Sequence, residues 1–255
     1  MSLRIRVVAK LVFTTRERSV FSYGMKTIGL LGGMSWESTV PYYRIINEVV
    51  REKLGGLHSA KAILYSVDFH DVERLQHSAR WEEAGELLAA SAQALQRSGA
   101  DFLVLCTNTM HKVAAAIEGA VSIPLLHIAD PTGTRIARAG FKTVGLLATR
   151  FTMEQDFYRR RLQEKFGLTV ITPDESDREI VHRVIYEELC LGRVTESSRE
   201  QYQRIIVQLI EQGAEAVILG CTEIAMLVGQ QHSTVPLFDT AAIHARAAAE
   251  HALAG

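Results

Sequence analysis

Two stretches of the sequence place a thiol, hydroxyls, an amide and a carboxyl group directly after a short apolar run. The first is 102–109, Phe-Leu-Val-Leu-Cys-Thr-Asn-Thr, and the second is 216–223, Ala-Val-Ile-Leu-Gly-Cys-Thr-Glu. When the stretches are aligned on the glycines that precede them, Thr107 corresponds to Cys221, 114 residues further on. Groups of these types can take or give a proton, so proton transfer is the chemistry that we expect at this pair.

The three cysteines are not equivalent candidates for this chemistry. A cysteine at the end of a buried strand is, taken alone, more often a small core residue than a catalyst, and the mirrored position of Cys221 is what favours a catalytic role. Cys106 aligns with Gly220, and because adjacent strand residues point to opposite faces, we expect Cys106 to face away from a ligand. Cys190 has no counterpart in the other stretch and is predicted to pack in the core or to line the site.

Two proton-handling groups on opposite sides of one carbon are what inversion of an amino-acid Cα requires in the absence of a cofactor. A thiol at a strand end that faces a helix N-terminus can have its pKa lowered into the useful range. A threonine hydroxyl is a far weaker acid and needs a neighbouring base. The other candidate bases are four histidines, which more often serve packing or hydrogen bonding: His70, His111, His127 and His182. His111 is the most interesting because it lies one helical turn beyond Thr107.

An amino-acid ligand would be held by its carboxylate. Asn108, Thr109 and Thr222, with the backbone N–H groups that follow each strand, can bind this group at the helix N-termini. Hydrogen bonds to the carboxylate also stabilise the carbanion that forms when the α-proton leaves.

The elements that must position these groups alternate between strands and helices. In the first half, strands are predicted at 26–33, 62–67, 102–105 and 123–128, and helices at 37–54, 81–97 and 111–117. Short links between alternating elements predict a mostly parallel sheet covered on both faces. The turn at Gly32 and Gly33 lacks the spacing of a dinucleotide site. We expect its glycines to let the backbone approach a small ligand closely.

Three landmarks recur in the second half of the chain in the same order. The segments 26–33, 99–101 and 123–126 are repeated at 142–149, 213–215 and 235–238, at offsets of 116, 114 and 112 residues. This repetition predicts an α/β fold of two pseudosymmetric Rossmann-like lobes, whose mostly parallel sheets face each other across a central cleft. We expect lobe 1 at 25–130, with about 235–255 packing back on it, and lobe 2 at 131–234.

Residues 1–24 differ from the rest of the chain. They carry five basic residues against one acid, and their apolar pieces are too broken for a secretory signal. An organelle transit peptide is a less favoured alternative. We expect an extension that is disordered or not native, with Met25 as the true start.

The composition limits the partners and the compartment. Of 255 residues, 47% are hydrophobic and 22% charged, with a formal net charge of −1. These values give no reason to expect binding to nucleic acid or to a membrane surface. Three cysteines form neither a disulfide framework nor the paired spacing of a zinc site. We therefore expect a cytoplasmic protein without a metal, whose partner is a small molecule.

The motifs at these positions resemble those of the aspartate/glutamate racemase family. The matching residues are Lys-Thr-Ile-Gly-Leu-Leu-Gly-Gly-Met-Ser at 26–35, Asn-Thr at 108–109 and Leu-Gly-Cys-Thr-Glu-Ile at 219–224. The resemblance implies a homodimeric racemase that uses two bases and no pyridoxal phosphate or other cofactor, with Cys221 and Thr107 as the catalytic pair. It also implies a set of substrate-binding residues: Met34, Gln76, Asn108, Thr109, Thr149, Thr222 and Glu223.

Departures from the family pattern concern the catalytic pair and the substrate. The usual first-half motif is Cys-Asn-Thr, whereas Thr107 begins it here, as in the threonine/cysteine branch of L-aspartate/glutamate-specific or broad-specificity amino-acid racemases. Cys221 should then be the efficient base and Thr107 the poor one. The positions of the arginine and lysine of aspartate-specific members hold Val72 and Cys190. Strict aspartate specificity is therefore not expected, and Gln76 could accept a neutral polar side chain such as that of homoserine.

Two alternatives to a racemase stay open at this point. Relatives with one cysteine decarboxylate malonates or act as other isomerases, and release of carbon dioxide from an arylmalonate would identify a decarboxylase. Paired α/β lobes around a cleft also occur in non-catalytic amino-acid-binding modules. Such a module would exchange no Cα proton with solvent.

Overall fold

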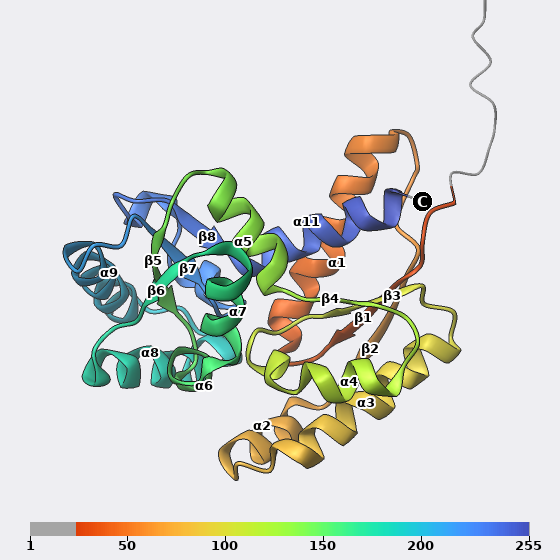
Figure 1. Cartoon of the computed structure of the whole chain (residues 1–255), viewed down its shortest axis with the longest axis horizontal. Coiled ribbons are helices and arrows are strands. Elements are labelled where there is room, and N and C mark those ends of the chain that lie inside the picture. The colour runs from red at the N-terminus through yellow and green to blue at the C-terminus, as the bar shows by residue number, and fades with distance from the viewer. Residues whose placement is uncertain (1–23, 255) are drawn as a thin grey trace, which may run out of the picture.

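The computed structural model describes residues 24–254, which form two four-stranded sheets, both entirely parallel. The first sheet has the order β2 (Ala62–Ser66), β1 (Ile28–Gly32), β3 (Phe102–Leu105) and β4 (Leu125–Leu126). The second has the order β6 (Thr169–Ile171), β5 (Thr143–Leu147), β7 (Ala216–Leu219) and β8 (Leu237–Asp239). The same order of strands in both sheets confirms the predicted α/β fold of two pseudosymmetric lobes, which lie side by side in Figure 1.

Helices cover both faces of each sheet. The helices of the first half are α1 (Trp36–Leu54), α2 (Phe69–His77), α3 (Trp81–Arg97), the 3₁₀ turn η1 (Thr109–Val113) and α4 (Ala114–Ala120). Those of the second half are α5 (Ala129–Arg138), α6 (Arg150–Glu154), α7 (Asp156–Phe166), α8 (Glu175–Glu187), η2 (Leu189–Leu191), α9 (Glu196–Glu211), α10 (Ile224–Leu227), η3 (Gln230–His232) and α11 (Thr240–Leu253). The single helix predicted at 111–117 is thus a 3₁₀ turn followed by a short helix.

The central strands are apolar because both faces of each sheet are covered. Every residue of β3 and of β7 is buried, and so is every residue of β1. The parallel register brings the carboxyl ends of β1 and β3 together in one lobe, where Leu31 pairs with Leu105, and those of β5 and β7 in the other, where Leu147 pairs with Leu219. The two candidate stretches therefore follow equivalent central strands.

The chain passes between the lobes at two places. It leaves lobe 1 after β4 and begins α5, which packs against α7 of lobe 2. It returns after β8, when α11 packs against α1 through an alanine-rich face in a shared core with Tyr42 and Ile46. Figure 1 shows α11 lying along α1. The range 235–255 therefore divides: residues 237–239 complete the second sheet, and the helix that follows lies on lobe 1.

The remaining expectations of the sequence concern the chain end and the membrane. The expected extension at 1–24 lies outside the described residues apart from Gly24. Within residues 24–254, no helix is long and apolar enough to cross a membrane.

Candidate active site

A small cavity lies between the lobes, at the carboxyl ends of both sheets. All nine residues predicted for the site line it: Met34, Gln76, Thr107, Asn108, Thr109, Thr149, Cys221, Thr222 and Glu223. They come from segments up to 189 residues apart and meet because the two halves face each other. Five further residues line the cavity: Phe69, Ile185, Tyr186, Cys190 and Gly220.

In lobe 2, the polar groups at the strand end surround the carboxylate of Glu223, a residue that is 1% exposed. Its Oε2 accepts hydrogen bonds from the thiol of Cys221 at 2.9 Å and from the hydroxyl of Thr222 at 2.8 Å. Its Oε1 accepts from Ser35 of lobe 1, at 2.6 Å from the hydroxyl and 3.3 Å from the backbone N–H. The carboxylate thus connects the thiol to the opposite lobe.

The Cys221 thiol is neutral in this environment. Burial raises its pKa well above the ordinary value, and the negative charge of Glu223 raises it further. The expected lowering by a helix N-terminus is wrong, because α10 is only four residues long and cannot outweigh burial beside a carboxylate. Cys221 is therefore a proton donor at neutral pH, and it can act as a base only after an acceptor such as Glu223 takes its proton.

The strand end of lobe 1 has a different set of partners. The position equivalent to Glu223 holds Thr109, whose hydroxyl lies 2.9 Å from that of Thr149 in lobe 2. Asn108 donates from Nδ2 to the hydroxyl of Thr240 at 2.9 Å, and its Oδ1 is buried with no hydrogen-bond partner in residues 24–254. Thr107 lines the cavity and is 6% exposed. The two strand ends therefore face one cavity with unequal chemistry, since only the second has a carboxylate beside its proton-handling residue.

A hydrogen bond across the lobes places an aromatic residue that the sequence reasoning missed. Tyr186 of α8 donates to Oε1 of Gln76 in α2 at 2.8 Å, and its ring stacks on Phe69 with centroids 6.2 Å apart. Gln76 in turn donates from Nε2 to the sulfur of Met110 at 2.9 Å. The sequence signals for these residues were that Phe69 follows β2 closely and that Tyr186 lies on the helix leading to Cys190.

The cavity has no cationic side chain. In the described part of the chain, its lining contains neither lysine nor arginine. Arg74 pairs with Asp71 at 3.8 Å on the surface, and Arg193 is exposed on lobe 2. Val72 is fully buried in the core, whereas Cys190 lines the cavity. Among the described residues that line the cavity, Glu223 alone carries a formal charge.

Two expectations for nearby residues have separate outcomes. Cys106 packs in the core of lobe 1 and does not line the cavity, which confirms that it faces away from the ligand. The expectation that Gly32 and Gly33 approach a ligand is wrong. A Cβ at Gly32 would meet the Thr39 side chain at 2.4 Å, and one at Gly33, where φ is +91°, would meet the carbonyl oxygen of Val67 at 2.3 Å. These glycines serve close packing within the protein.

The four histidines considered as bases lie outside the lining of the cavity. His70 is exposed, and His182 accepts a hydrogen bond from the backbone N–H of Arg150. His127 accepts from the backbone N–H of Ala129. His111 bonds to backbone groups through both ring nitrogens. Within residues 24–254, no three of the histidine, cysteine, aspartate and glutamate side chains are grouped so that they could hold a metal ion.

We expect the buried histidines to make the protein sensitive to acid. Burial lowers the pKa of His127 to about 3 and those of His182 and His244 to about 4, and it lowers the pKa of His111 well below its ordinary value. The folded state then binds fewer protons than the unfolded state, whose histidines titrate near pH ~6.5. Stability from these groups is present above that pH and is lost as the pH falls, by up to ~1.4 kcal/mol per unit for each histidine.

Urea unfolding at pH 7, 6 and 5 measures this dependence. A His127→Gln variant should show a smaller loss of unfolding free energy between pH 7 and 5 than the parent. Equal stability of the parent at pH 7 and pH 5 would contradict the neutral, buried state of these histidines.

The same fold and sequence pattern occur in proteins of one family. Residues 31–248 match the family model described as Asp/Glu/Hydantoin racemase. A crystal structure from Yersinia pestis, provisionally described as an Asp/Glu racemase, is 59% identical and superposes with a TM-score of 0.83, covering 90% of this chain and 100% of that one. An aspartate racemase homologue from Pyrococcus horikoshii OT3 is 37% identical, with a TM-score of 0.77 over 89% of this chain and 99% of that one. The broad-specificity amino-acid racemase RacX of Bacillus subtilis (strain 168) is 23% identical over 86% of this chain and 95% of its own length.

Proposed function

The chain belongs to the Asp/Glu/hydantoin racemase family, and on that premise we propose that it is an amino-acid racemase, an isomerase that uses no pyridoxal phosphate. It inverts Cα by two-base proton transfer, with Cys221 and Thr107 on opposite faces of the substrate. The observation that carries this proposal is the meeting of both strand ends at one cavity, with the Cys221 thiol 2.9 Å from the Glu223 carboxylate.

The proposed cycle begins when Glu223 accepts the proton of the Cys221 thiol. The thiolate removes the α-proton of the bound amino acid, and the Thr107 hydroxyl delivers a proton to the opposite face of the carbanion. Thr107 then regains a proton, supplied from Glu223 through solvent, so that every group returns to its starting state. The neutral thiol and its adjacent carboxylate support this order of events, because the acceptor for the first proton is already in place.

We propose that the first lobe binds the ammonium group and that hydroxyls hold the carboxylate. The unpaired Oδ1 of Asn108 supplies a buried acceptor for an ammonium N–H. The hydroxyls of Thr109 and Thr149, which contact each other from opposite lobes, and the backbone N–H groups after β3 and β7 supply donors for the carboxylate. Hydrogen bonds to the carboxylate strengthen as the carbanion forms, which lowers the barrier to proton removal.

We expect the enzyme to prefer amino acids with neutral polar side chains, such as homoserine, over aspartate. A second carboxylate on the substrate would enter a cavity without lysine or arginine and with the charge of Glu223 already in it. An unpaired buried charge costs several kcal/mol, so kcat/KM for aspartate should be at least ~10-fold below that for the best neutral substrate. The measurement is a panel of single-enantiomer amino acids in D₂O, with Cα exchange and inversion followed by NMR.

This panel also tests the proposed function itself. Racemisation gives the opposite enantiomer with deuterium at Cα, whereas a binding module gives no exchange and a decarboxylase releases carbon dioxide.

A Cys190→Lys variant serves as the matched test of charge, since it adds a cation to the lining. Its aspartate activity should rise relative to its homoserine activity. Aspartate preference in the unmodified chain would contradict the assignment of a neutral side chain.

We also propose a cytoplasmic homodimer. Trp36, Val40 and Tyr43 follow one another at helical spacing on α1 and are each more than half exposed, which supports burial against a second copy. All three cysteines are free, as expected of a protein in a reducing compartment.

A further inference from the structure

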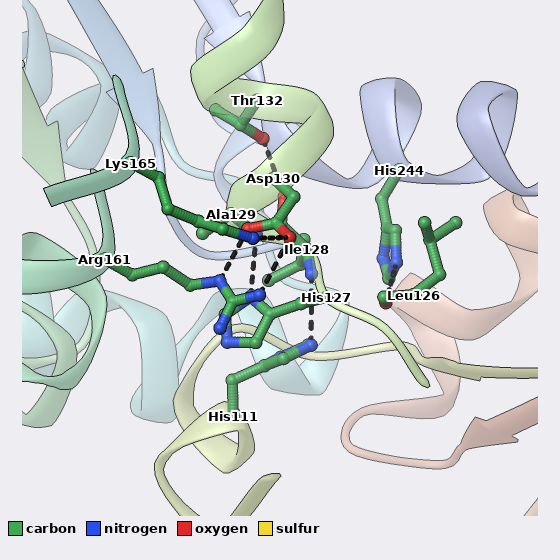
Figure 2. A network of polar contacts seen from close by, with 10 residues as sticks. All are labelled: His111, Leu126, His127, Ile128, Ala129, Asp130, Thr132, Arg161, Lys165 and His244. Atoms are coloured by element: carbon green, nitrogen blue, oxygen red, sulfur yellow. Dashed lines mark hydrogen bonds and ion pairs between the residues drawn. The ribbon is translucent and has the colours of Figure 1, made fainter. Parts of the chain in front are cut away.

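His111 is a buried histidine that the proposed chemistry leaves without a task, although it lies directly behind the first strand end. Only 3% of the surface of His111 is exposed to solvent. Nδ1 lies 2.7 Å from the carbonyl oxygen of Thr107, and Nε2 lies 3.1 Å from the backbone nitrogen of Ile128. Figure 2 shows the second of these contacts, with the His111 ring directed at the backbone of Ile128.

These two contacts define the protonation of the ring. A carbonyl oxygen can only accept a hydrogen bond, so Nδ1 carries the proton and donates it to Thr107. A backbone N–H can only donate, so Nε2 is bare and accepts from Ile128. Both ring nitrogens are therefore saturated by backbone groups, and His111 cannot exchange a proton with a ligand while these contacts last.

The two backbone groups belong to different parts of the molecule. Thr107 follows β3 and lines the cavity, whereas Ile128 begins the passage of the chain from lobe 1 into α5. A second histidine contacts the same region from α11, the helix with which the chain returns to lobe 1. His244 of α11 donates from Nε2 to the carbonyl oxygen of Leu126 at 2.8 Å and accepts from the Tyr42 hydroxyl at 3.0 Å. The strand end of Thr107 is thus tied to the segment through which the lobes are joined.

We propose that His111 is a positioning residue for Thr107: by joining the Thr107 carbonyl to the backbone of Ile128, it fixes the Thr107 hydroxyl at the distance and angle at which it can protonate the carbanion. This inference rests on the proposed racemase function. A reacting group displaced by about 1 Å can lose ~10²-fold in rate, so a loose strand end should impair this step and leave the Cys221 step intact.

The carbanion has two possible fates, and the ratio of their products reports whether Thr107 is correctly placed. This ratio does not depend on how much of the enzyme is active. The carbanion formed by Cys221 can be reprotonated by Cys221, which returns deuterated substrate in D₂O, or by Thr107, which gives the inverted product. A misplaced Thr107 raises the ratio of exchanged substrate to inverted product. A variant that is merely less folded lowers both quantities together and leaves the ratio unchanged.

Two amide variants separate the two contacts of the ring. In His111→Asn, the side-chain N–H group occupies the place of Nδ1 and can still donate to Thr107. In His111→Gln, the longer amide reaches the place of Nε2 and can accept from Ile128, but the donor to Thr107 is lost. The matched control is His127→Gln, because the His127 ring lies 4.3 Å from that of His111 and bonds to Ala129 within its own turn.

We expect the ratio to rise ~10-fold or more in both His111→Gln and His111→Asn, because each keeps only one of the two contacts and so breaks the connection, and to stay within ~2-fold of the parent in His127→Gln. A His111→Leu variant, which removes both contacts, should raise the ratio at least as much if it folds. An unchanged ratio in His111→Gln or in His111→Asn, or an equal rise in the His127→Gln control, would overturn the proposal. Failure of the racemase function is seen separately, since the unmodified protein would then show neither exchange nor inversion with any amino acid.

Discussion

Replacing Cys221 by alanine is expected to lower kcat for racemisation by ~10²–10⁴-fold, because general acid–base catalysis by one positioned group contributes a factor of this size. Neither of the other two thiols occupies the strand end that faces Thr107. Cys106 is fully buried in the core of lobe 1, and Cys190 lines the cavity from the turn after α8. The assay is the rate of inversion of the best substrate from the panel.

Cys106→Ala is the matched control for this variant. It removes the same atoms from the equivalent strand end, one position out of register with Thr107. Its kcat should stay within ~3-fold of the parent, although the smaller side chain leaves a void in the core and lowers the unfolding free energy by ~1 kcal/mol. Retention of full racemase activity by the Cys221→Ala variant would disprove the assignment of the first base.

Replacing Glu223 by glutamine is expected to lower kcat by roughly 10²-fold with a smaller change in KM. The amide keeps the size of the side chain and can still accept from Ser35 through its oxygen. Its NH₂ group cannot accept from Cys221 or Thr222, which both donate to Oε2 in the parent. The thiol then has no nearby group to take its proton, so the thiolate forms more rarely.

A half-buried carboxylate outside the lining of the cavity separates this effect from a loss of stability. Glu188 accepts hydrogen bonds from the hydroxyls of Thr195 and Ser198 in lobe 2, and it does not line the cavity. Glu188→Gln should cost stability of the same order, ~1–3 kcal/mol, with kcat unchanged. If Glu223→Gln lowers the melting temperature but leaves kcat like that of the parent, the carboxylate serves only to join the lobes.

The fold could be predicted from this sequence because its landmarks are duplicated. The segments around Gly29 and Gly145 begin equivalent central strands, and the structure pairs each with the strand that carries a candidate residue. The path of the end of the chain was harder to predict. Residues 237–239 form a short strand whose partner is 20 residues away in sequence. The helix α11 packs on α1 through alanines, and the spacing of these alanines does not indicate which helix they contact.

The site could be predicted as a set of residues but not as an electrostatic environment. The positions of Thr107 and Cys221 followed from the repeat, and both line the cavity. The raised pKa of the thiol did not follow from it, because burial and the side-chain direction of Glu223 depend on the packing of both lobes. The hydrogen bond between Tyr186 and Gln76 joins residues 110 positions apart, a separation for which neither helix carries a local signal.

Because the two strand ends are unequal, the slow proton transfer should differ between the two directions of racemisation. Rate constants alone cannot show this difference. Enantiomers have equal free energies in solution, so kcat/KM for a racemase must be the same in both directions. The difference between a thiol with an adjacent carboxylate and a threonine hydroxyl must therefore be sought in which proton transfer limits each direction. When Thr107 removes the α-proton, that removal is slow. When Cys221 removes it, the slow step is delivery of the new proton by Thr107.

The α-deuterium isotope effect on kcat/KM, measured for each enantiomer of the best substrate, reports this difference directly. We expect a large effect for the enantiomer whose proton Thr107 removes, and a small effect for the other, with solvent deuterium entering the recovered substrate. In a Thr107→Cys variant the two isotope effects should converge. Equal isotope effects in the unmodified enzyme, or a difference that the Thr107→Cys variant does not change, would contradict a two-base mechanism with Cys221 and Thr107 as unequal partners.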